Sequence, residues 1–143
     1  MHAIRHVIRP LRLVTAPPNA SVFDVARTMT VARVGAIPIV EDGCVVGIFS
    51  ERDLMTRVLV EGLDAKQTQV REVMTRHVLT ASPEDTRSEC IVRMRGARCR
   101  HLPVLEHGQL IAVLSMRDLL RDEIEEQHEE IQGLRAYLHQ TPI

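Results

Sequence analysis

The stretch that decides the fold is IPIVEDGCVVGIFSERDL, residues 37–54. Two apolar runs rich in valine and isoleucine flank Glu41-Asp42-Gly43. An Asp-Gly pair between β-branched runs is a strong signal for a tight β-hairpin. The second run ends at Ser50, where Ser-Glu-Arg-Asp leads into a helical pattern. The stretch therefore predicts a hairpin whose second strand turns directly into a helix.

A similar stretch, LPVLEHGQLIAVLSMRDL, occurs 65 residues later at residues 102–119. The similarity continues outward, because residues 13–55 align with residues 78–120 without a gap. A period this long that occurs only twice does not predict a solenoid, which stacks three or more units. We therefore expect two similar units packed as a pseudo-twofold pair.

Each unit is expected to have the order β-α-β-β-α, which makes the fold class α+β. A proline should stop each first strand, and a serine should cap the helix that follows. The expected strands are LRLVT (11–15) and HVLT (77–80), and the expected helices are 21–32, capped by Ser21, and 84–96, capped at Ser82-Pro83. Residues 61–76 are expected to form a linker with a short helical turn around VREVM (70–74).

Composition excludes several classes of protein. The 143 residues carry a net charge of −1, so no overall field attracts nucleic acid or an anionic membrane. No apolar run is long enough to span a bilayer, and no signal peptide is recognisable. The three cysteines have no repeated spacing, which favours a reducing compartment over a disulfide framework. We expect a cytoplasmic protein that binds neither nucleic acid nor membrane.

The Ser-x-Arg-Asp corner permits three interpretations. Ser50 and Asp53 have the spacing of a helix capping box, and capping alone would explain both copies. Arg52 and Arg117, however, lie in the first helical turn, where a cation costs about 0.3 to 1 kcal/mol. An anion bound at the helix N-terminus would reverse that cost, and a hydroxyl with an arginine suits phosphate. Alternatively, both arginines point into solvent and pair with acids such as Glu51.

The two 18-residue stretches together resemble a tandem pair of CBS (cystathionine-β-synthase) domains of the stand-alone type. The resemblance covers residues 8–122 and divides the chain into repeat 1 (8–60), a linker (61–76), repeat 2 (77–122) and a C-terminal helical extension (123–143). It implies a non-catalytic module that senses AMP, ADP, ATP, S-adenosylmethionine or NAD in clefts between the repeats. Such pairs usually form disc-like dimers.

The resemblance also implies roles for individual residues. Hydroxyl and arginine groups would bind phosphate and the aspartate would bind ribose, which assigns Ser50, Arg52, Asp53, Ser115, Arg117 and Asp118. Adenine would lie against Thr15, Ala36, Ile37, Pro38, Thr80, His101, Leu102 and Pro103. Core packing is the alternative for Ile37 and Leu102. Ala112 replaces the glycine found at Gly47, and we expect its methyl group to crowd the second cleft.

Other chemistry has weaker support in the sequence. Cys99 and His101 are metal-ligand types, but no second pair completes a tetrahedral site. A nucleophilic Ser50 or Ser115 would lack an assigned base. We therefore expect no catalytic residues, no metal and no required cofactor, with AMP or ATP as the favoured ligand. The alternative function is a protein-interaction scaffold with empty clefts.

The C-terminal sequence predicts one long helix over residues 116–139. Its apolar positions step by four and three residues, a heptad seam with one polar member. The seam consists of Leu120, Ile124, Gln127, Ile131, Leu134 and Leu138. It either packs on the same subunit or meets a second subunit. We expect a homodimer to which this helix contributes, and an effector protein whose identity the sequence does not reveal.

Overall fold

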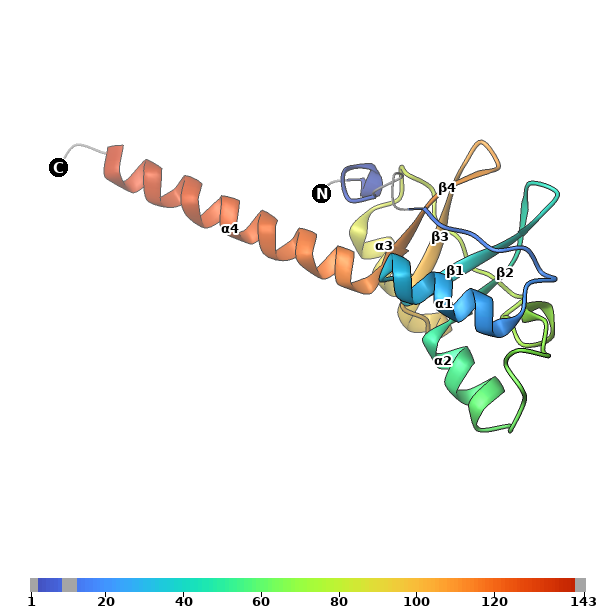
Figure 1. The fold of residues 1–143 in the computed structure, drawn as a ribbon. Helices are drawn as coiled ribbons and strands as arrows, with labels where there is room; N and C mark the ends of the chain where they lie inside the picture. Colours follow the sequence, from blue (N-terminus) through green and yellow to red (C-terminus); the bar gives the residue numbers. More distant parts are fainter. Residues whose placement is uncertain (1–2, 9–12, 141–143) are drawn as a thin grey trace.

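The structure is a computed structural model that describes residues 3–8 and 13–140. Two repeats, each with a helix, an antiparallel hairpin and a second helix, lie side by side, and the last helix extends far beyond them (Figure 1). This arrangement confirms the α+β class and the long C-terminal helix. The first repeat contains α1 (Val22–Ala32), β1 (Ala36–Glu41), β2 (Cys44–Ser50) and α2 (Glu51–Asp53), and the second contains α3 (Arg87–Ala97), β3 (His101–Glu106), β4 (Gln109–Ser115) and α4 (Met116–Gln140).

The two hairpins have the same turn, as the paired motifs predict. Asp42 and Gly43 have φ values of 52° and 77°, and His107 and Gly108 have 53° and 78°. Two consecutive residues with positive φ are the signature of a type I′ turn, which matches the twist of the flanking strands. Each ladder also has one irregularity at the same place, after Ile39 and after Val104. The hairpins are therefore confirmed as copies of one unit.

The first helix begins where the sequence predicts, but α3 does not. Ser21 caps α1 by accepting a hydrogen bond from the backbone N–H of Asp24 at 3.1 Å. The predicted start of α3 at Ser82-Pro83 is wrong, because these residues form a turn and the helix begins at Arg87. Thr86 and Glu89 form a complete capping box there, which satisfies backbone N–H groups that Ser82 could not reach.

The predicted strands LRLVT and HVLT are also wrong over their described part. Residues 13–15 and 77–80 have no strand pairing, and residues 11 and 12 lie outside the described residues. Ala16 and Ala81 instead form single parallel bridges to Ile39 and Val104. Proline follows each bridge closely, and its lack of a backbone N–H prevents the pairing from continuing.

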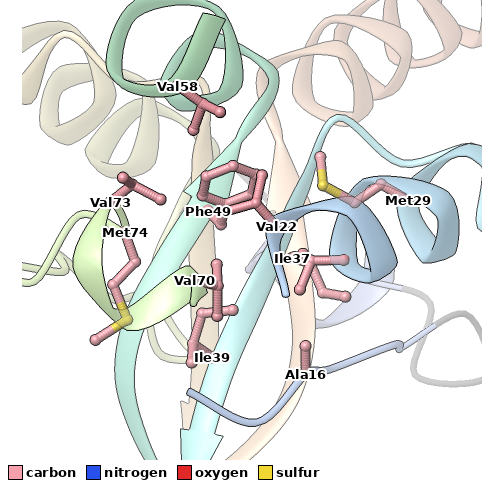
Figure 2. Packing of buried hydrophobic residues seen from close by; sticks show 11 residues of the cluster. Ala16, Val22, Met29, Ile37, Ile39, Phe49, Val58, Val70, Val73 and Met74 are labelled. Atoms are coloured by element: carbon pink, nitrogen blue, oxygen red, sulfur yellow. The ribbon is translucent and has the colours of Figure 1, made fainter. Parts of the chain in front are cut away.

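The hydrophobic core has two parts, one for each hairpin. In the first, Phe49 and Ile37 of the hairpin pack with Met29 of α1 (Figure 2). The predicted helical turn around VREVM is confirmed as a 3₁₀ helix at Val70–Glu72. Val70, Val73 and Met74 from this segment are buried in the same cluster. The segment between the repeats is thus part of the first core.

The start of the chain fills the corresponding place in the second core. Ile4 begins a short 3₁₀ helix, Ile4–His6, and its side chain is completely buried with Leu102, Leu114 and Leu119. Its backbone N–H donates to the carbonyl of Asp85 at 2.8 Å. Arg5 adds surface ion pairs with Glu84 and Glu106. The first described residues of the chain therefore complete the second repeat, and the boundaries of the two repeats stay a prediction.

The substitution Gly47→Ala tests how closely the segment of residues 70–75 packs against the first hairpin. A Cβ atom added at Gly47 would lie 2.5 Å from Sδ of Met74 and 3.0 Å from the carbonyl oxygen of Thr75. Gly47→Ala should therefore lower the free energy of unfolding by about 1 to 3 kcal/mol, the usual cost of overpacking. Urea denaturation measures the change.

The matched control is Gly96→Ala in α3, where an added Cβ meets no atom within 4 Å. That substitution should stabilise the protein by about 0.5 to 1 kcal/mol, because alanine is the better helix former. Equal stabilities for the two variants would contradict the packing argument.

Candidate functional site

The candidate site is built around two corners, defined as residues 50–53 and residues 115–118. In the first corner, the Ser50 hydroxyl accepts from the backbone N–H of Asp53 at 3.2 Å. The Asp53 carboxylate accepts from the backbone N–H of Ser50 at 3.0 Å. Ser115 and Asp118 exchange the same two bonds, each of 3.0 Å. The capping-box interpretation is therefore confirmed for both corners.

The two aspartates differ in what else they contact. Asp53 is only 6% exposed, and it accepts further hydrogen bonds from the Ser50 hydroxyl and, at 3.2 Å, from the Thr75 hydroxyl. The Arg57 guanidinium lies 3.5 Å from the same carboxylate. Asp118 is partly exposed, and its carboxylate accepts a hydrogen bond from the Ser115 N–H. The second corner thus presents a more accessible acceptor than the first.

The sequence does not predict Thr75 as a site residue, because Thr75 lies in the segment expected to be a linker. A signal was available, since IRHVI at residues 4–8 resembles VREVM at 70–74, one residue out of step with the main repeat. Each of these segments packs against one hairpin, so the residue after VREVM reaches the first corner. The equivalent residue of the other segment, Arg9, lies outside the described residues.

Arg52 connects the first corner to the second repeat. Its guanidinium donates to the carbonyl oxygen of Arg98 at 2.8 Å. Arg98 is the C-cap of α3 in the left-handed conformation, and a helix C-terminus carries partial negative charge that favours a cation. This bond accounts for an arginine in the first turn without a bound anion and without Glu51 as its partner. Arg117, its counterpart, is exposed.

His101 lies between the two repeats. Its imidazole packs against Gly35, where an added Cβ would lie only 3.3 Å from His101 Cε1. Burial lowers the pKa of His101 from its ordinary value of 6.5, because the charged form loses its hydration. Glu51 and Asp118 partly oppose this shift in pKa, and Arg100 adds to it. His101 therefore belongs to the contact between the repeats.

The remaining predicted adenine contacts are spread between core and surface. Ile37 and Leu102 are completely buried members of the two cores, so core packing accounts for both. Ala36, Pro38 and Pro103 are also buried in the hairpins. Thr15 is exposed and Thr80 half-buried, each beside a bridging alanine. The structure brings these residues near the hairpins but does not gather all of them around one opening.

A cavity of about 220 Å³ lies at the second corner. Asp118 and Arg121 of α4 line it on one side, and His6 and Ile8 of the N-terminal segment on the other; Val7, Asp122 and Glu125 complete the lining. Its place differs from the expected cleft between the repeats. Ala112 is not part of its lining but is buried in the second core, so the expected crowding by its methyl group does not occur there.

The part of the chain that the structure describes contains neither a metal-binding cluster nor a membrane-spanning helix. No group of three or more histidine, cysteine, aspartate or glutamate side chains is arranged to hold a metal ion within residues 3–8 and 13–140. No helix in this part of the chain is long and apolar enough to cross a membrane.

Removing each aspartate should reveal the difference between the corners. Asp53→Ala removes a cap and leaves the half-buried Thr75 hydroxyl and Ser50 N–H without their acceptor, so it should cost about 2 to 4 kcal/mol of unfolding free energy. Asp118→Ala removes a partly exposed cap and should cost about 1 kcal/mol. Denaturant titration of both variants measures the costs. Equal losses would show that the burial of Asp53 adds nothing.

His101 should make the stability of the protein depend on pH. Because its pKa is lower in the folded than in the unfolded state, the unfolded chain binds more protons between the two values. Stability should therefore fall as the pH drops below about 6.5 toward the folded-state pKa. His101→Gln has no imidazole to titrate, so it should lose less stability than the wild type between pH 7.5 and 5.5 in thermal unfolding. Parallel losses in both proteins would exclude His101 as the source.

Comparison with known proteins agrees with this architecture. The sequence profile of the CBS domain matches residues 4–60 and 70–125. The mitochondrial CBS domain-containing protein CBSX3 of Arabidopsis thaliana is 33% identical over 123 residues, which are 82% of this chain and 60% of CBSX3. The chain thus spans less than two thirds of that relative. The crystal structure of the CBS domain protein NE2398 superposes with a TM-score of 0.79 at 33% identity, covering 86% of this chain and 98% of that one.

Two more distant structures share the fold and contain adenosine compounds. The CBS domain pair of MJ0100, in complex with 5′-methylthioadenosine and S-adenosyl-L-methionine, has a TM-score of 0.79 at 21% identity and covers 88% of this chain and 98% of that one. CBSX2 in complex with AMP has a TM-score of 0.75 at 21% identity, with 89% and 99% covered. The profile match over both repeats and the close structural agreement establish that this chain belongs to the CBS domain family, as a tandem pair.

Proposed function

We propose that the protein is a non-catalytic regulatory module that binds an adenosine-containing ligand, with AMP or ATP favoured, and transmits the binding to an effector protein. The observation that carries this proposal is the cavity at the second corner, which Asp118 and Arg121 line together. A carboxylate can accept hydrogen bonds from ribose hydroxyls, and a guanidinium can pair with phosphate. The adenosine compounds bound to the two distant CBS pairs support this ligand class.

The structure favours the second corner over the first as the ligand site. The Asp53 carboxylate is buried under Thr75 and Arg57, and Arg52 is engaged with the carbonyl of Arg98. A ligand at the first corner would have to displace these contacts. We therefore assign the ribose role first to Asp118, which lines the cavity together with Arg121. The phosphate roles of Ser115 and Arg117, which are not part of the lining, and the roles of the counterparts Ser50, Arg52 and Asp53 come second.

We further propose a cytoplasmic homodimer. Met55 and Leu59 after α2 are exposed apolar residues, and so are Leu120 and Ile124 of α4, which stand exactly one repeat later in the sequence. Two equivalent apolar patches on the two repeats suit a second copy that packs against both. The mitochondrial name of CBSX3 concerns that relative, so the compartment of this chain stays a prediction.

Calorimetry and thermal shift with AMP, ADP, ATP, S-adenosylmethionine and NAD test the ligand. At a concentration 100 times its dissociation constant, the ligand should raise the unfolding free energy by about 2.7 kcal/mol. Asp118→Ala should weaken binding by at least about tenfold, the loss expected for hydrogen bonds to a charged group.

Thr86→Ala is the matched control, because it removes a helix cap of similar value that lies outside the cavity lining. It should bind the ligand as the wild type does. If none of the five compounds binds, the interaction scaffold with an empty cavity is the better description. If Thr86→Ala and Asp118→Ala lose equal affinity, the effect comes from stability and the ribose role is wrong.

A further inference from the structure

The outer part of α4 leaves its apolar seam exposed in the described monomer. From Gln127 to His139 every side chain is exposed, and Ile131, Leu134 and Leu138 are each at least 50% exposed. Figure 1 shows this end of the helix far from both hairpins. The alternative that the seam packs on its own subunit is therefore wrong for this stretch. Exposed large apolar residues in a line are costly unless another surface covers them.

The contacts near the start of α4 determine which side of the helix faces outward. Arg87 of α3 bonds Asp122 at 2.8 Å and Glu126 at 2.6 Å, and these ion pairs are largely shielded from solvent. Both acids lie on the side of the helix opposite the seam. The repeats thus hold α4 by its polar side and leave the apolar seam directed to solvent.

The seam assigns each residue of α4 to a heptad position, and charged residues occupy the positions beside the seam. Ile124, Ile131 and Leu138 occupy position a, and Leu120, Gln127 and Leu134 occupy position d. The e positions that flank the seam are basic or imidazole-bearing, namely Arg121, His128 and Arg135. The g positions are Glu123, Glu130 and Tyr137. One flank therefore carries carboxylates and the other carries cationic types.

This charge pattern discriminates between the two possible orientations of a helix pair. In a parallel pair, each g residue faces the e residue of the next heptad on the partner helix. Glu123 would then face His128, and Glu130 would face Arg135, so opposite charge types meet. In an antiparallel pair, g faces g and e faces e, which sets Glu130 against glutamate and Arg135 against arginine. Like charges at such positions destabilise the pair.

We propose that the occupant of this seam is the same helix of a second copy of this chain, in a parallel two-stranded coiled coil. Isoleucine at position a and leucine at position d are the preferences of parallel two-stranded coils. Gln127, at position d, is the one polar member of the seam and would lie opposite its own copy in a parallel pair in register. The helices are too short to pair stably alone, so the coil forms together with contacts between the repeats.

Disulfide trapping tests the orientation in the full-length chain. In a background with Cys44→Ser and Cys99→Ala, Leu134→Cys places a thiol at position d, opposite its own copy in a parallel coil. Glu129→Cys, on the far side of the helix, is the control. Mild oxidation should cross-link the position-134 variant at least about tenfold faster, because only there do the Cβ atoms approach within disulfide reach.

An antiparallel pair centred on the seam would place residue 134 opposite Ile124. The two thiols would then be separated by about 15 Å along the axis, too far for a disulfide. Cross-linking no faster than in the control, or cross-linking only after a second cysteine is added at position 124, would overturn the proposal.

Charge exchange provides a second test that does not depend on cysteine. Glu130→Arg creates two repulsive contacts with Arg135 in a parallel dimer and should raise the dimer dissociation constant by about tenfold in sedimentation equilibrium at low salt. In the double variant Glu130→Arg/Arg135→Glu, positions 130 and 135 of a parallel pair again carry opposite charges, so its dissociation constant should return close to the wild-type value. A double variant as weak as the single one would contradict the parallel pair.

These variants lie outside the ligand cavity, so nucleotide binding and pairing of the helices can fail independently.

Discussion

The structure depends on one constraint, which is that a two-stranded hairpin cannot bury its own apolar side chains. An isolated hairpin is marginal in water, and stability requires a helix or further chain against its face. Each hairpin in this protein receives a helix from its own repeat and a short 3₁₀ segment from elsewhere in the chain. Val70 and Ile4 are both completely buried as the anchors of these segments. The segments complete the two cores and bring Thr75 and His6 to the corners where the candidate sites lie.

The corners show how one local motif acquires two environments. Ser50 and Ser115 make the same cap, so the backbone conformation at both corners is equivalent. The segments that pack against the two hairpins, residues 70–75 and residues 4–8, differ. Thr75 bonds to the buried carboxylate of Asp53, whereas a cavity lies beside Asp118. The difference between the corners therefore comes from long-range packing and not from the motif. A repeat that is symmetric in sequence can in this way place an accessible carboxylate on one side only.

The features that could be predicted from the sequence are those determined by neighbouring residues. The Asp42-Gly43 turn, the Ser21 cap and the Ser-x-x-Asp capping boxes depend on contacts within a few positions, and all were confirmed. The predicted start of α3 was wrong because Ser82-Pro83 and Thr86 are competing local signals for a helix start. Only the alignment of Thr86 with Ser21 in the repeat distinguishes the two signals. The burial of Asp53 could not be predicted, because its partner Thr75 is 22 residues away. The place of Ile4 depends on a contact with a core formed more than eighty residues later.

The position of Ile4 has a consequence for the order of events during synthesis. Residues 4–8 cannot reach their final place until β3, β4 and the start of α4 have been made. Domains generally fold as they emerge, and the first repeat has its own segment from residues 70–74 within reach much earlier. Residues 4–8 must stay unpacked during that interval and close a long loop at the end, which slows folding. The nascent chain therefore passes through a stage in which the first repeat is complete while residues 4–8 are not yet packed in the second core.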